Sequence, residues 1–110
     1  MGRTESEADE AVRRQELVIR PEADADITEA YEWYEDQVAG LGLEFLEAVD
    51  ACLRIVRRHP RMYQVVHKSV RRAPLLRFPY GLLYVVENDK IAVVACFHAR
   101  RDPSHWQSRM

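Results

Sequence analysis

The 110-residue chain has no long hydrophobic run, few glycines and only two cysteines. The longest uncharged apolar run, Ile91–Phe97, is far shorter than the roughly 20 residues of a membrane-spanning helix, so we expect no membrane span. Two cysteines in a chain without an export signal indicate a reducing compartment, and we expect a cytoplasmic protein. Lysine is also scarce. Arginine supplies 14 of the 16 cationic side chains, and its planar guanidinium suits phosphate and carboxylate.

The patterns of metal and nucleotide sites are missing as well. The cysteines lie 44 residues apart, each in an apolar segment, so we interpret both as small buried side chains. The Gly40-Leu41-Gly42 segment joins two helical patterns and does not follow a strand, unlike a phosphate-binding loop. We therefore expect neither a metal nor a cofactor.

Charge is divided unevenly along the chain. Residues 1–50 carry 15 acidic and 4 basic side chains, whereas residues 51–110 carry 3 acidic and 12 basic ones. The two halves therefore have charges of −11 and +9, which sum to the net charge of −2. A cationic second half suggests an anionic target, either nucleic acid or an acidic protein surface. The alternative is that the two halves neutralise each other in the folded domain.

Hydrophobic periodicity predicts a single domain over residues 15–110, after a flexible charged tail over residues 1–14. A short strand at Leu17–Ile19 precedes two amphipathic helices, one with an apolar stripe from Ala23 to Val38 and one from about Leu43 to Arg58. The short glycine-containing turn between them predicts an antiparallel hairpin. The expected buried seam between helices and sheet consists of Ile27, Tyr34, Phe45, Leu46, Val49 and Leu53.

The second half of the chain is typical of strands. Asn88 and Asp89 sit between two β-branched runs and predict a tight hairpin turn. The order of one strand, two helices and then further strands predicts an α+β fold, with the antiparallel helix hairpin packed on a three- to four-stranded antiparallel sheet. The strands of this sheet are expected at Tyr63–Val66, Arg71–Phe78, Leu82–Val86 and Ile91–Phe97. In the second of these, Pro74 and Pro79 suggest an edge, a bulge or an early end of the strand.

A cationic segment that follows the last strand is the strongest candidate for a functional site. It reads His98-Ala99-Arg100-Arg101-Asp102-Pro103, which can bind an anion, and an imidazole can move a proton near neutral pH. Three more arginines would face the same surface if their strand neighbours the hairpin. The alternative is an ordinary exposed face whose arginines pair with nearby carboxylates. The full set of candidates is Arg71, Arg72, Arg77, His98, Arg100 and Arg101.

An ordered set of short motifs resembles the RelE/ParE toxin superfamily of bacterial type II toxin–antitoxin, or plasmid-stabilisation, operons. The resemblance extends from residue 17 to about residue 109. The motifs are Arg-Pro-Glu-Ala from Arg20, Asp-Ile-x-Glu-Ala-x-x-Trp-Tyr from Asp26, Gly-Leu-Gly-x-x-Phe-Leu from Gly40, a His-Pro stop at His59, Arg-Arg-x-x-x-x-Arg-Phe-Pro-Tyr from Arg71 and Phe-His-x-Arg-Arg-Asp-Pro from Phe97.

The resemblance implies a compact α+β domain and one of two activities. RelE-like members cut messenger RNA at the ribosome, whereas ParE-like members lack the catalytic set and poison DNA gyrase. The chain ends in Ser-His-Trp-Gln-Ser-Arg from Ser104, without the clustered His-Tyr pair of some ribonuclease members. If the chain were a ribonuclease, His98 and Arg100 would be the catalytic candidates.

Our first hypothesis is a ParE-like, non-catalytic inhibitor of gyrase that a cognate antitoxin neutralises. A pI near 6.1 favours a protein target over RNA. The alternatives are a RelE-like ribosome-dependent endoribonuclease and an inactive homologue that only binds antitoxin. Antitoxins of this kind use disordered segments that fold on contact, as a helix in a groove or as an added strand. The expected antitoxin-binding residues are Trp33, Tyr63 and Val65.

Overall fold

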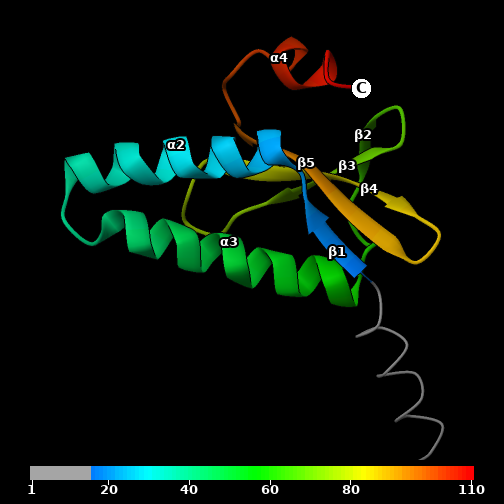
Figure 1. The fold of residues 1–110 in the computed structure, drawn as a ribbon, viewed down its shortest axis with the longest axis horizontal. Helices are drawn as coiled ribbons and strands as arrows, with labels where there is room; N and C mark the ends of the chain where they lie inside the picture. The colour runs from blue at the N-terminus through cyan, green and yellow to red at the C-terminus, as the bar shows by residue number, and fades with distance from the viewer. Residues whose placement is uncertain (1–15) are drawn as a thin grey trace, which may run out of the picture.

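A computed structural model describes residues 16–110 of the chain (Figure 1), so the tail predicted at residues 1–14 lies outside the described residues. Two long helices lie side by side against one face of a single sheet, and a short third helix follows the last strand (Figure 1). In chain order the elements are β1 (Glu16–Ile19), α2 (Pro21–Gln37), α3 (Leu41–Arg58), β2 (Val65–His67), β3 (Val70–Pro74), β4 (Tyr80–Glu87), β5 (Lys90–His98) and α4 (Ser104–Gln107).

The turn between α2 and α3 confirms the predicted helix hairpin. Gly40 has a φ of 90°, in the left-handed region that glycine adopts without a steric cost. The carboxylate of Glu35 accepts hydrogen bonds from the backbone N–H groups of Gly40 (2.9 Å) and Gly42 (3.0 Å). Because a side chain from α2 satisfies amides at the start of α3, the second helix begins at Leu41, earlier than the predicted Leu43.

The sheet has five strands in the order β1-β5-β4-β3-β2. Strands β2 to β5 form the predicted antiparallel part, and β1 joins the same sheet at its edge, parallel to β5 with Leu17 opposite Ile91. The β4–β5 turn confirms the expected hairpin, with a φ of 52° at Asn88. Strand β3 ends at Pro74, so of the three outcomes that the prolines of the Arg71–Phe78 segment suggested, the structure shows the early end: a proline cannot donate to a sheet, and a loop follows it.

A β-bulge in β5 decides which side chains face the helices. Leu83 pairs with Ala95 and Tyr84 pairs with Val93, so Val94 is an extra residue in β5. Val94 and Ala95 therefore both face away from the helices, whereas Val93 and Cys96 face towards them. A strict alternation of side chains along the sequence would have assigned about half of the residues of β5 to the wrong face of the sheet.

The helix side of the sheet holds the main core. Ile27, Phe45 and Val49 are buried there, as the helical spacing predicted. The other three predicted seam residues, Tyr34, Leu46 and Leu53, are partly buried and pack against the same cluster. Val38 is 61% exposed, because α2 ends at Gln37 and the helical spacing no longer applies there.

The opposite face of the sheet carries a second, smaller core. The Trp106 indole of α4 is buried in one cluster with Val70, Leu83 and Phe97. This contact holds the segment after β5 against the face of the sheet opposite the helices. No helix among residues 16–110 has the length and the apolar character that crossing a bilayer requires.

Candidate functional site

His98, the last residue of β5, lies on the helix side of the sheet. Its ring packs edge-on against Tyr80, with 5.2 Å between the ring centroids. Its Nδ1 atom accepts a hydrogen bond from the backbone N–H of Arg100 at 3.0 Å. This bond selects the neutral tautomer that carries its proton on Nε2, so the imidazole offers a donor and no free acceptor.

Two cationic side chains stack on the Phe97 ring, which lies on the face of the sheet opposite the helices. The Arg101 guanidinium carbon lies 5.0 Å from the ring centroid, and that of Arg109 lies 5.4 Å from it. Both distances are within the range of a cation–π interaction. The His105 ring lies 6.3 Å from the same centroid. Phe97 therefore holds two arginines near each other despite their like charge.

Arg72 extends along the same face. Its guanidinium covers Gly81, where a Cβ atom would stand only 2.7 Å from the Arg72 Nε. Gly81 is the register partner of Phe97 across β4 and β5. Gly81 therefore gives the guanidinium room to lie close to the backbone.

The two remaining arginine candidates of β3 and its loop have structural partners elsewhere. Arg71 donates hydrogen bonds to the backbone carbonyls of Tyr63 (2.6 Å) and Arg61 (3.1 Å), and so ties the segment before β2 to the sheet. Arg77 has a φ of 72° and pairs with Glu44 of α3 at 2.6 Å.

The six target-binding candidates thus do not form one cluster. Arg72 lies on the face opposite the helices, and Arg101 reaches the Phe97 ring on that face. His98 and Arg77 lie on the helix side, and Arg71 lies on the interior strand β3, bound to the segment before β2. Arg100 is exposed in the loop after β5. The part that these residues play in target binding stays a prediction.

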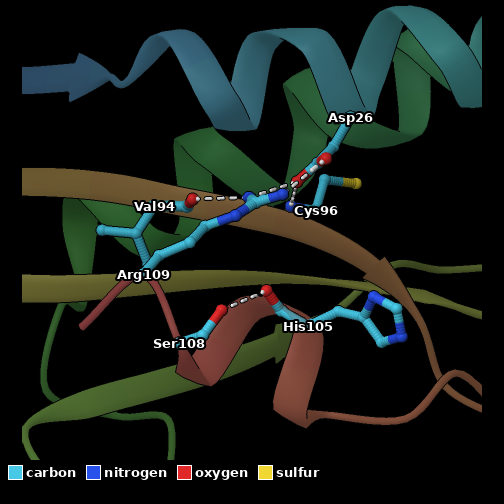
Figure 2. A network of polar contacts seen from close by, with 6 residues as sticks. All are labelled: Asp26, Val94, Cys96, His105, Ser108 and Arg109. Atoms are coloured by element: carbon cyan, nitrogen blue, oxygen red, sulfur yellow. Dashed lines mark hydrogen bonds and ion pairs between the residues drawn. The ribbon is translucent and has the colours of Figure 1, made fainter.

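An ion pair that the sequence did not reveal joins the C-terminus to α2. Arg109 donates to both carboxylate oxygens of Asp26, at 2.8 and 3.1 Å (Figure 2). Asp26 also accepts the backbone N–H of Cys96 at 3.0 Å, and Arg109 donates to the carbonyl of Val94 at 3.2 Å. These two backbone groups lie on the edge of β5 beyond the end of β1, where no strand of the described part of the chain pairs with them. The hydrogen bonds to Asp26 raise the pKa of Arg109 above its usual value.

The thiols offer no reactive nucleophile. Burial raises the pKa of Cys52 to about 11 and that of Cys96 to about 12, so both are protonated at neutral pH. The residues from 16 to 110 hold no group of three or more His, Cys, Asp or Glu side chains that could bind a metal ion.

The three antitoxin-binding candidates do not share one site. Tyr63 lines a groove of about 300 Å³ between α3 and the β3–β4 loop, and Val65 is 43% exposed on the edge strand β2. Trp33 is 56% exposed on α2 and lines a different pocket. The apolar residues of the groove are Ala48, Ala51, Cys52, Ile55, Tyr63, Pro74 and Leu76.

Comparisons with known proteins agree with this architecture. A family model described as "ParE toxin of type II toxin-antitoxin system, parDE" matches residues 17–103. A solved chain titled "Chromosomal ParDE TA system from P. aeruginosa" superposes with a TM-score of 0.69 at 16% identity, covering 76% of this chain and 95% of that one. No curated protein sequence matches significantly. Because the family model covers most of the folded domain, the chain belongs to the ParE toxin family of type II toxin–antitoxin systems.

Proposed function

We propose that this toxin inhibits DNA gyrase in the cytoplasm by binding it, without catalysis, and that a cognate antitoxin neutralises it. The observation that carries the proposal is the scatter of the candidate cationic groups: of the five candidate arginines, Arg101 alone lines a pocket together with the His98 imidazole. His98 packs on Tyr80 on the helix side, whereas Arg72 covers Gly81 on the opposite face. A ribonuclease needs a proton-transferring group and cationic groups around one phosphate. Arginines spread over a wide surface instead suit a protein–protein contact.

The exposed loop after β5 is the part of this surface that we expect to contact the target. Arg100 and Arg101 are both exposed there, and the Arg101 guanidinium stacks on Phe97. Stacking limits the number of conformations of this side chain before binding, which lowers the entropy lost on association.

The groove along α3 supports an antitoxin partner. It is apolar at its base, and Leu76 (73% exposed) and Ile55 stand at its surface. Glu44, Glu47 and Arg77 supply charges to the same groove. An amphipathic helix presents a stripe of apolar side chains that such a groove can bury. The short edge strand β2 offers backbone groups for an added strand beside it.

Induction of the toxin in a bacterial host tests the target. We expect inhibited supercoiling and DNA damage. Changing Arg100 and Arg101 together to Ala should weaken toxicity, because it removes binding energy. Arg54 and Arg58 changed together to Ala are the matched control, since both are exposed on α3, away from that loop. His98→Gln should leave most toxicity intact.

Two other outcomes would each contradict the proposal. Rapid cutting of messenger RNA within codons, abolished by His98→Gln, would identify a RelE-like ribonuclease, in which a general acid or base typically contributes 10²–10⁴-fold. A folded protein without any toxicity would identify an inactive homologue that only binds antitoxin.

The antitoxin is tested by co-expressing the neighbouring gene. We expect growth to recover and the two proteins to elute together at micromolar concentration. Ile55→Asp should prevent co-elution, because it puts a charge into the apolar groove. Leu43→Asp, on an exposed part of α3 that does not line the groove, is the control. Separate elution of the unmodified proteins would contradict an antitoxin role for this partner.

A further inference from the structure

A second pocket, of about 310 Å³, lies between α2 and the ends of β4 and β5. Three aromatic side chains, Trp33, Tyr34 and Tyr80, form its apolar part, and the polar part includes Glu29, His98 and Arg101. It shares no lining residue with the α3 groove. The pocket is therefore a second concave site, separate from the groove assigned to the antitoxin.

The aromatic rings of the pocket are arranged edge to face. Trp33 and Tyr34 are nearly perpendicular, at 83°, with 5.1 Å between ring centroids. Tyr34 lies 6.1 Å from Tyr80 at an angle of 65°. Tyr34 and Tyr80 also pack on Phe45, whereas Trp33 is largely exposed, and the face of an aromatic ring attracts cations. An indole that is 56% exposed beside such a pocket is typical of a residue that a partner covers.

The charge around the pocket favours a cation as well. The helix α2 has seven acidic side chains and no basic one. Asp26 is already neutralised by Arg109, but Glu29 has no ion-pair or hydrogen-bond partner among residues 16–110. Burial raises the pKa values of Tyr34 and Tyr80, so both hydroxyls stay neutral at neutral pH. A guanidinium between these rings would meet one carboxylate and two phenol oxygens.

Among residues 16–110, Arg101 is the one cation that lines the pocket, and its position limits its repulsion of a bound cation. Its guanidinium carbon stacks 5.0 Å from the Phe97 centroid, and Phe97 belongs to the opposite face of the sheet. We propose that this pocket binds the guanidinium of an arginine in a basic segment of a partner protein. The proposal does not depend on gyrase being the target.

A small peptide tests this assignment directly. The probe is acetyl-Gly-Gly-Arg-Gly-Gly-amide, titrated to about 10 mM because a single side chain binds weakly. The readout is the indole N–H resonance of Trp33 in the folded protein. The buried Trp106 on the opposite face serves as an internal control. We expect a saturable shift of the Trp33 signal, an unmoved Trp106 signal and no response to the same peptide with glutamate in place of arginine.

Two variants with opposite expected effects identify the charge that the pocket prefers. Glu29→Gln should weaken the binding of the arginine peptide by up to about fivefold, the effect of one exposed ion pair. Arg101→Gln should strengthen binding, because it removes a like charge. Glu32→Gln removes the same charge from α2 outside the pocket and should have a smaller effect. The proposal is overturned if no peptide saturates, if Glu32→Gln matches Glu29→Gln, or if the glutamate peptide binds and Arg101→Gln weakens it.

Discussion

Asp26 and Arg109 lie 83 residues apart in the sequence and form a two-point ion pair that ties the C-terminal segment to the first long helix (Figure 2). Their side chains are only 13% and 25% exposed. The pair also binds the two backbone groups of β5 that β1 is too short to reach. One interaction therefore secures a helix, a strand edge and the chain end together.

Removing this pair should destabilise the domain. Asp26→Asn and Arg109→Gln should each lower the free energy of unfolding by about 1–3 kcal/mol, because each leaves a partly buried charge without its partner. In urea denaturation the double variant should lose less than the sum of the two single variants, since both remove the same interaction. Strictly additive losses would show that the two side chains are not coupled.

The aromatic centre of the helix-side core should be the most sensitive to truncation. Phe45 is fully buried and contacts Tyr34, Phe78 and Tyr80 at centroid distances of 5.3–5.4 Å. Phe45→Ala should cost about 3–5 kcal/mol and lower the melting temperature strongly. Leu43→Ala, at an exposed position of the same helix, is the control and should change stability little. An unchanged melting temperature of the Phe45 variant would show that the faces of α3 are misassigned.

The helix hairpin should not tolerate a side chain at Gly42. A Cβ there would stand 2.8 Å from both the ring and the backbone carbonyl of Tyr31. Gly42→Ala should therefore destabilise the protein by about 1–3 kcal/mol, although alanine is the better helix former. Thermal unfolding followed by circular dichroism measures this difference. A stabilised variant would mean that α2 and α3 can move apart at no cost.

Stability should fall in alkaline solution. Burial raises the pKa of Cys52 from 9.0 to about 11, of Cys96 from 9.0 to about 12 and of Tyr84 from 10.0 to about 12. The folded state holds these protons where the unfolded state releases them, so stability is complete below pH 9 and is lost as pH rises towards 12. Each group contributes about 1 kcal/mol per pH unit within its window.

Urea unfolding at a series of pH values measures this loss. Cys96→Ala should reduce the slope of stability against pH above pH 9, whatever it does to stability at neutral pH. Tyr84→Phe should reduce the slope above pH 10 and also remove the hydrogen bond that the hydroxyl donates to the Pro60 carbonyl at 2.7 Å. An unchanged slope in both variants would contradict the assignment of the alkaline transition to these buried groups.

Local patterns in the sequence determined the helices, the hairpin turn and most of the main core. The spacing of Ile27, Phe45 and Val49 predicted their burial, and Asn88 predicted the tight turn, because helical periodicity and turn preference depend on residues close in the chain. The ordered motifs also indicated the family that the comparisons show.

Only the tertiary structure decided how the functional candidates are distributed. The bulge at Val94 shifted the face of every later residue in β5, and so put Phe97 on the face opposite the helices and His98 on the helix side. The partner of Arg109 and the burial of Trp106 likewise depend on contacts between distant segments. Side-chain periodicity carries no information on where a bulge falls or which distant group meets a charge, because both are fixed by packing and hydrogen bonding across the whole sheet.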